Sequence, residues 1–234
     1  MKYYGLRVYD LEESIIASSL PMLKKKLTPQ EFEGEVTNLK SVIELYGKNR
    51  LLEWSKLPKE KLELKGDTII KAIKHFKRAM NLGNAKPNSG HDCFSKGCLI
   101  AVNIEADQSF WLQWERYHHQ DTVSSMSTMH CLTKFDLYDG LFSEWTDKRQ
   151  INILNEKIVE YNTNPTQDNF HRVIHNCPEG IELCRRVDSN YLQFKTMYNQ
   201  REFHKMYAWS KDFLRLCDEL PYFEELCLNK KEDK

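Results

Sequence analysis

The sequence has no surplus of charge of either sign, because 34 lysine and arginine residues balance 34 aspartate and glutamate residues. Proteins that coat nucleic acids or lie on anionic membranes need a positive surplus, so the balance argues against both kinds of partner. It still leaves room for a local basic pocket around one anionic ligand. No apolar run approaches the roughly 18–20 residues of a membrane-spanning helix, and residues 1–9 lack the apolar core of a secretion signal. We therefore expect a cytoplasmic protein.

Cysteine is present in an odd number, seven, at irregular intervals. A disulfide framework needs pairs and is typical of small secreted chains, so reduced thiols in a cytoplasm are the better interpretation. The sequence has no Cys-x2-Cys pair, and its two nearest mixed clusters lack the paired spacing of a tetrahedral zinc site. These clusters are His130 with Cys131 and His175 with Cys177. No metal site is expected.

The chain is rich in apolar and aromatic residues, at 41% and 12%, which is too many for a disordered chain. Its 234 residues can form one full-sized domain that needs no metal or disulfide for stability. No internal repeat is present. We expect one domain over residues 1–228, followed by a charged, disordered tail at 229–234.

Capping signals and apolar spacing predict most of the chain as helix. The run Thr28-Pro29-Gln30-Glu31 combines an N-cap, a first-turn proline and a capping-box glutamate. It precedes an apolar stripe that ends at Gly47: Phe32, Val36, Leu39, Ile43 and Tyr46. Further helices are expected near residues 10–20, 67–81, 110–120, 147–161, 166–175, 190–205 and 209–219.

One strand is predicted where Cys98, Ile100, Val102 and Ile104 alternate with more polar residues. It follows a loop at 82–90 whose glycine, asparagine and proline content is typical of functional loops. Many helices around at least one strand indicate an α+β fold. The absence of βαβ alternation and of a Gly-x-Gly-x-x-Gly motif disfavours a Rossmann sheet.

The segment QWERYHH, which begins at Gln113, carries groups that could bind a ligand. On a helix, Gln113, Arg116 and Tyr117 share one face. An amide, a guanidinium and a phenol together can hold a planar heteroaromatic ring that carries a phosphate. The alternative, which this segment favours when taken alone, is a solvated face with Trp111 and Trp114 in the core.

Three other segments have both a functional and a structural interpretation. Residues 124–130 contain four hydroxyls within five positions, but they lack a nucleophile elbow and support a hydrolase only weakly. On the predicted helix 190–205, Asn190 and Arg201 bracket an apolar centre, an arrangement that a purely packing helix seldom needs. Alternatively, Arg201 is simply solvated. His91, beside the 82–90 loop, is by itself explained as a turn residue.

Taken together and in order, these segments resemble the flavin-dependent thymidylate synthases, which make dTMP without a cysteine nucleophile. Gly90-His91-Asp92 is similar to the family's Gly-His-Glu element. The run from Gln113 to His118 is similar to its Gln-x-x-Arg-His-Arg signature, and Ser127 to the serine that follows.

A second part of the resemblance lies near the C-terminus. Pro178 precedes Asn190, Asn199 and Arg201, which match the family's Asn-x8-Asn-x-Arg spacing on a long helix. Motifs similar to those of the family therefore extend over roughly residues 91–213.

The sequence departs from the family pattern at several positions. Tyr117 replaces the central histidine of the signature and His118 its last arginine, while Met129, His130 and Thr196 replace an aromatic residue, an arginine and an asparagine. In the family, the signature's charges meet the flavin diphosphate. Because each charge-assisted hydrogen bond contributes about 1.5–3 kcal/mol, fewer permanent charges weaken such binding.

The resemblance implies a single α+β domain, with helices around a small, mostly antiparallel sheet, in a homotetramer whose sites are shared between subunits. It implies one-carbon transfer from methylenetetrahydrofolate to C5 of a pyrimidine deoxynucleotide, dUMP, with FAD as hydride donor and NADPH as reductant. The implied flavin-binding residues are His91, Arg116, Tyr117, His118 and Asn190, and the implied nucleotide-binding residues are Gln113, Ser125, Ser127, Arg172 and Arg201. Arg201 and Ser127 are the expected catalytic residues.

Two alternatives stay open. The same fold could catalyse hydroxymethylation or act on another pyrimidine nucleotide, which would fit the altered signature. It could also be a flavin-free homo-oligomer that binds nucleotide or is purely structural. The retained pattern of Asn190, Asn199 and Arg201 opposes a purely structural role.

Overall fold

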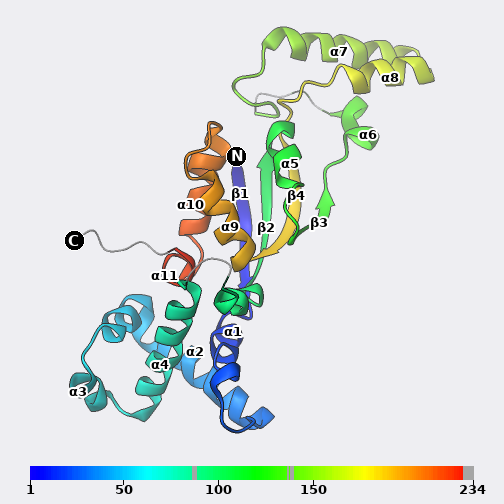
Figure 1. Ribbon diagram of the computed structural model, residues 1–234. Helices are drawn as coiled ribbons and strands as arrows, with labels where there is room; N and C mark the ends of the chain where they lie inside the picture. Colours follow the sequence, from blue (N-terminus) through cyan, green and yellow to red (C-terminus); the bar gives the residue numbers. More distant parts are fainter. Residues whose placement is uncertain (86–88, 136, 138–139, 229–234) are drawn as a thin grey trace. The chain divides into compact units, whose positions relative to one another are not determined.

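The structure is a computed structural model that describes residues 1–85, 89–135, 137 and 140–228. Part of the predicted loop, residues 86–88, and the predicted tail, 229–234, lie outside the described residues. The expected fold class is confirmed: a single, mainly helical α+β domain with a small four-stranded sheet (Figure 1). The domain boundaries at residues 228 and 229 stay a prediction.

The strands of the sheet lie in the order β1-β2-β4-β3. Their bounds are Lys2–Tyr9 for β1, Leu99–Ala106 for β2, Gln120–Ser125 for β3 and Leu183–Asn190 for β4. β3 pairs antiparallel with β4, with an irregularity between Thr122 and Ser124. β3 is an edge strand, and five of its six residues are exposed.

The sequence analysis predicted only β2, whose first residue is Leu99 rather than Cys98. The helix expected at 110–120 is shorter: α5 (Gln108–Trp114) ends before Glu115, and β3 begins at Gln120. The helix expected at 190–205 also loses residues at both ends, because β4 includes Asn190 and α9 (Tyr191–Arg201) stops at Arg201.

Within the domain, contacts cluster in two compact units, each built from three separate segments of the chain. The first unit comprises residues 1–7, 101–189 and 201–214, and the second comprises 8–100, 190–200 and 215 onward. The chain thus passes repeatedly from one unit to the other, so neither unit is a continuous stretch of sequence.

The first unit contains two apolar cores. One is aromatic: Phe110 and Trp114 of α5 pack against Trp209 and Phe213 of η5 (Ala208–Phe213), with Phe110 stacked on Trp209 at 4.3 Å between ring centroids. The other lies beside the helix pair α7 (Lys148–Thr163) and α8 (Gln167–His175), where residues such as Leu154, Ile158, Val173 and Ile181 are buried. Short helices α6 (Thr128–Cys131) and η4 (Leu132–Lys134) precede this pair.

The second unit is mainly helical. Its longer helices are α1 (Leu11–Ala17), α2 (Pro29–Ser55) and α4 (Asp67–Gly83). Its shorter ones are η1 (Leu20–Met22), α3 (Lys59–Leu62), η2 (Glu63–Lys65), η3 (His91–Lys96) and α11 (Phe223–Cys227). Short α10 (Leu214–Asp218) follows η5 and begins in the first unit.

The capping box predicted at the start of α2 is present. Thr28 Oγ1 accepts from the Glu31 backbone N–H at 3.1 Å, and the Glu31 carboxylate accepts from the Thr28 N–H at 2.8 Å. Gly47, expected to close the helix, adopts φ 75° and interrupts it, but helical structure resumes and continues to Ser55. The predicted stripe is buried at Val36 and Leu39, whereas Tyr46 is 44% exposed.

A polar network joins α4 to α2 in the second unit. Arg78 Nη2 donates to His75 Nδ1 at 2.6 Å, and His75 Nε2 lies 3.4 Å from Glu35 Oε2. Because the guanidinium can only donate, Nδ1 must accept, and the ring proton of neutral His75 is on Nε2, facing Glu35. Burial, followed by the charge of Arg78, lowers the pKa of His75.

All seven cysteines are free thiols. None of the helices among the described residues is both long and apolar enough to cross a membrane. In the same part of the chain, histidine, cysteine and carboxylate side chains do not gather in groups of three or more that could hold a metal ion.

Candidate functional site

The first unit brings together three of the predicted site residues, two of which lie around the guanidinium of the third. Arg201, the last residue of α9, donates from Nε to the Tyr117 hydroxyl and from Nη1 to Gln113 Oε1, each at 2.8 Å. Gln113 lies in the last turn of α5 and Tyr117 in the turn that follows. The side chain of Arg201 is therefore fixed by two acceptors of one short segment.

The turn after α5 explains why both acceptors face Arg201. α5 begins at Asp107, whose carboxylate accepts from the Phe110 N–H at 2.9 Å, and ends at Trp114. The Tyr117 N–H still donates to the Trp114 carbonyl at 3.1 Å, so the chain keeps turning beyond the helix. Gln113 and Tyr117 therefore both face Arg201, although the helix on which they were predicted does not continue, and Arg116, predicted on the same face, is exposed.

The flat face of Trp209 lies beneath Arg201. The guanidinium carbon is 4.4 Å from the centroid of the Trp209 ring, within the range of a cation–π interaction. Trp209 is fully buried and belongs to η5, which is a π-helix. π-helical turns are rare and are frequently found at functional sites.

The positive charge of Arg201 has no carboxylate partner among the described residues. Of its five N–H groups, two donate within this part of the chain, so three are left for an incoming acceptor. Partial burial, followed by the charge of Arg201, lowers the pKa of nearby His204. The cluster is thus a fixed cation suited to oxygen atoms that carry negative charge.

The residues predicted for flavin binding divide between the two units. In the first unit, Arg116 and His118 are exposed in the turn after α5, whereas Tyr117 is hydrogen-bonded to Arg201. In the second unit, exposed His91 begins η3 directly after Gly90, and Asn190 Oδ1 accepts from the Gln193 N–H at 2.9 Å. Asn190 therefore caps α9 and keeps only its amide N–H groups for a ligand.

The remaining residues predicted for nucleotide binding have local roles. Ser127 caps α6 by accepting from the His130 N–H at 3.3 Å, and Ser125 is exposed at the end of β3. Arg172 pairs with Glu160 of the neighbouring helix α7 at 3.1 Å. In the described part of the chain, no hydrogen bond joins these three to Arg201. Their predicted ligand contacts stay predictions.

Several residues of the cluster were not assigned to the site by the sequence analysis. Met206 accepts from Gln113 Nε2 at 3.1 Å, which orients the amide so that its oxygen faces Arg201. On β4, Arg185 pairs with Glu115 and lies 4.5 Å from the Trp111 ring, so it fixes the turn that carries Tyr117. The Trp209 ring and Met206 follow Arg201 by eight and five residues, and no motif marks them.

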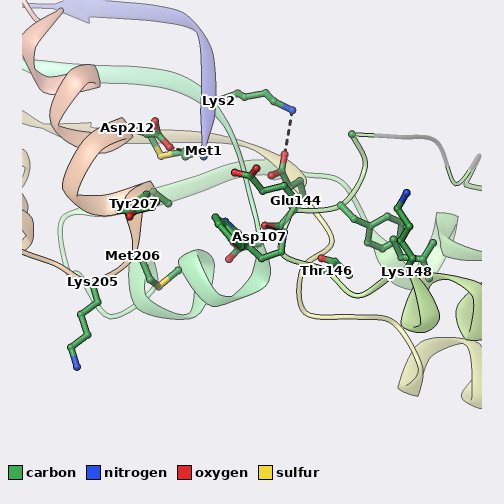
Figure 2. Close-up of a pocket in the computed structure, with 17 residues that line it drawn as sticks. Met1, Lys2, Asp107, Glu144, Thr146, Lys148, Lys205, Met206, Tyr207 and Asp212 are labelled. Atoms are coloured by element: carbon green, nitrogen blue, oxygen red, sulfur yellow. Dashed lines mark hydrogen bonds and ion pairs between the residues drawn. The ribbon is translucent and has the colours of Figure 1, made fainter.

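A cavity of about 840 Å³ lies in the first unit, beside this cluster (Figure 2). Its lining residues include Met206, Tyr207, Glu144, Trp145 and Lys148. Met206 connects the cavity to Gln113 through the hydrogen bond to its sulfur. None of the predicted site residues lines the cavity.

Comparison with known proteins supports the fold. No protein-family model and no curated protein matches the chain. A solved structure of the flavin-dependent thymidylate synthase ThyX from Helicobacter pylori, complexed with FAD and dUMP, matches with a TM-score of 0.61 and 9% identity, over 98% of each chain. A second structure of Helicobacter pylori ThyX with FAD and dUMP matches with a TM-score of 0.54 and 11% identity, over 82% of this chain and 93% of that one. The chain therefore has the fold of the flavin-dependent thymidylate synthase ThyX.

Proposed function

We propose that the protein belongs to the flavin-dependent thymidylate synthase family and transfers a one-carbon unit to C5 of a pyrimidine deoxynucleotide, dUMP. The fold supports this proposal, because solved structures with this fold hold FAD and dUMP. The observation that carries it is the geometry of Arg201, which is held by Gln113 and Tyr117 over Trp209 and keeps three N–H groups for a ligand.

Arg201 can act as both a binding and a catalytic group in this reaction. C5 of a pyrimidine is nucleophilic when the ring carries negative charge, and that charge is shared with the ring carbonyl oxygens. A guanidinium that is already oriented stabilises that charge without reorganising, and such preorganised donors are often the largest single contribution to catalysis. Gln113 and Tyr117 supply the orientation. By the resemblance, no protein nucleophile attacks the ring.

The residues implied for flavin binding fit an anionic diphosphate by the chemistry of their donors. Arg116 carries a permanent charge, and His118 and His91 add ring N–H donors; all three are exposed. Asn190 can add its amide N–H groups, because only its oxygen is used in capping α9. FAD, when bound, supplies the hydride of the reaction.

The other components of the reaction come from the resemblance alone. We propose methylenetetrahydrofolate as the one-carbon donor, NADPH as the reductant of the flavin, and a cytoplasmic homotetramer as the active form. The dependence on each component can be measured by omitting it from the assay, and the assembly by light scattering.

Nucleotide binding provides the first test. We expect saturable binding of dUMP to the wild-type protein by calorimetry, and loss of that binding in Arg201→Ala with an unchanged oligomeric state. Arg50→Ala is the matched control, because Arg50 is exposed in the second unit and pairs only with Glu53 among the described residues. Unchanged dUMP affinity in Arg201→Ala would contradict the site assignment.

Flavin binding and turnover provide the second test. Protein mixed with FAD and passed through gel filtration should keep a yellow flavin spectrum. With methylenetetrahydrofolate and NADPH added, it should release tritium from the C5 position of labelled dUMP. A product that carries a hydroxymethyl rather than a methyl group would identify the related reaction on the same fold.

One observation favours a second candidate function, a nucleotide-binding protein without flavin. Tyr117, which replaces a family histidine, is committed to Arg201, and the signature segment keeps a single arginine, Arg116. One permanent charge holds a diphosphate less tightly than two. A colourless protein that rejects added FAD but still binds dUMP through Arg201 would establish this second function and exclude the first.

A further inference from the structure

One ammonium group in the second unit holds both ends of a loop. Lys195, in the middle of α9, donates from Nζ to the Gly83 carbonyl and to Asp92 Oδ2, each at 2.7 Å. Gly83 is the last residue of α4, and Asp92 is the second residue of η3. The segment that connects α4 to η3 is therefore attached to α9 at both of its ends.

The ion pair between Lys195 and Asp92 is largely shielded from water. Their side chains are 13% and 17% exposed. Charges in such a position are screened little by salt, and loss of one partner leaves the other uncompensated, so the pair strongly favours a single arrangement. The ion pair of Lys40 with Glu13 in the same unit is more exposed, at 45% and 32%, and exposed pairs contribute little.

Asp92 connects this ion pair to His91. His91 begins η3 directly after Gly90, which adopts the left-handed conformation with φ 75°. Ser95 Oγ donates to the Asp92 carbonyl at 2.6 Å, and the Cys93 N–H donates to the Gly90 carbonyl at 3.4 Å. These bonds make one compact turn of the residues around His91. Because the Asp92 carboxylate joins that turn to α9, the position of the His91 backbone depends on Lys195.

The same helix also fixes Asn190. Asn190 Oδ1 accepts from the Gln193 N–H at 2.9 Å and so caps α9. The Tyr191 N–H donates to the Cys98 carbonyl at 3.0 Å, which joins the start of α9 to the chain just after η3. His91 and Asn190, the two residues of the second unit implied for flavin binding, are thus both attached to α9.

We propose that Lys195 is a positioning residue for flavin binding, which keeps His91 at a fixed place relative to Asn190. The inference deepens the proposed function and rests on it for the identity of the ligand. Asp92 compensates the charge of Lys195, so the contribution of Lys195 is geometric rather than a contact with the diphosphate. A donor that is already in place loses less conformational freedom when the ligand binds, and this raises the affinity. No motif of the sequence marks Lys195.

A double variant separates positioning from stability. Lys195→Met with Asp92→Asn removes the ammonium without leaving an unpaired charge, and it preserves the net charge of the protein. Because a shielded ion pair can often be replaced by neutral residues of similar volume without loss of stability, the urea midpoint should stay close to that of the wild type. The matched control is Lys40→Met with Glu13→Gln, which removes the ion pair between α2 and α1 in the same unit.

Hydrogen exchange measures whether Lys195 fixes the turn. In the double variant, the backbone amides of residues 91–97 should exchange at least about tenfold faster, while those of α2 keep their wild-type rates. The control variant should leave residues 91–97 unchanged. Unchanged exchange at 91–97 in the double variant would overturn the proposal, because Lys195 would then not hold the turn. An equal rise in α2 would also overturn it, since Lys195 would then stabilise the unit as a whole.

A titration with FAD, followed by flavin fluorescence, measures the effect on the ligand. The double variant should bind FAD about fivefold more weakly than the wild type, and the control variant should bind it equally well. The affinity for dUMP should stay within about twofold, because neither changed residue belongs to the group that holds Arg201. Unchanged FAD affinity, together with faster exchange at 91–97, would overturn the role of Lys195 in flavin binding.

Failure of the proposed function would look different. A wild-type protein that binds no FAD would overturn the proposed use of flavin. Faster exchange confined to residues 91–97 in the double variant would, even then, establish that Lys195 positions His91.

Discussion

Tyr117→Phe removes a single oxygen atom from the group of side chains that holds Arg201. The phenylalanine ring can keep the packing position of the tyrosine, but the Arg201 Nε–H loses the acceptor that lies 2.8 Å away. A hydrogen bond that involves a charged group contributes about 1.5–3 kcal/mol. Because Arg201 is only half-buried, water can partly replace the lost acceptor. We therefore expect the free energy of unfolding to fall by about 1–1.5 kcal/mol, at or just below the lower limit of that range.

Urea denaturation of a double-mutant cycle measures this contribution. The cycle combines Tyr117→Phe with Arg201→Met, and we expect the two changes to be coupled by about 1 kcal/mol. Tyr9→Phe is the control, because the hydroxyl of exposed Tyr9 forms no hydrogen bond with the described residues. Additive effects within about 0.3 kcal/mol, or an equal loss in Tyr9→Phe, would refute the view that Tyr117 positions Arg201.

Three further predictions concern stability. Burial and Arg78 lower the pKa of His75 below its unfolded value near 6.5, so the stabilisation that depends on the neutral ring is present above about pH 6.5 and lost as the pH falls below it. Urea unfolding at about pH 7.5 and 5.5 should therefore show a smaller pH dependence in His75→Gln than in the wild type. Thr28→Ala should cost about 1 kcal/mol in the same assay, because it removes the N-cap of α2; no loss would contradict the capping role. Gly83→Ala should cost about 2 kcal/mol or more, because its Cβ would lie 1.9 Å from the Leu226 carbonyl oxygen, and a wild-type melting temperature would contradict that close approach.

The helices could be predicted because residues close in the sequence determine where they begin. Thr28, Asp147 and Thr166 were each expected near a helix start, and each side chain accepts a hydrogen bond from a backbone N–H of its first turn. This interaction involves residues two or three positions apart, so it needs no knowledge of the tertiary structure.

The strands were harder to predict because the pattern of apolar and polar residues in a strand depends on what it packs against. β3 is exposed on both faces, so it has no apolar alternation. β4 contains Arg185 and Arg186, and these polar residues are accommodated by tertiary contacts: Arg185 by the Trp111 ring and Arg186 by the Gly5 carbonyl. Neither partner is near β4 in the sequence.

The candidate site could also be predicted only in part: its residues from the sequence, but not their contacts. Gln113, Tyr117 and Arg201 were all named from the sequence, but Tyr117 was expected on the flavin side and the other two on the nucleotide side. In the structure Arg201 is hydrogen-bonded directly to both Tyr117 and Gln113, across 84 and 88 positions of sequence. A motif indicates which residues to examine, whereas their mutual contacts follow only from the fold.

The π-helical turn at Ala208–Phe213 has a consequence for how the sequence of this segment can evolve. A π-turn contains one residue more than the α-helical turn it replaces, and its hydrogen bonding is less favourable. Deletion of one residue between 208 and 213 would let the segment close as an ordinary α-helix, which should make the protein more resistant to heat. The same deletion would rotate Trp209 away from the guanidinium above it. Selection for thermal resistance and selection for a correctly placed arginine therefore act in opposite directions at this single turn. Variants that lack one residue here should gain stability, and they should occur only where the arginine is no longer needed.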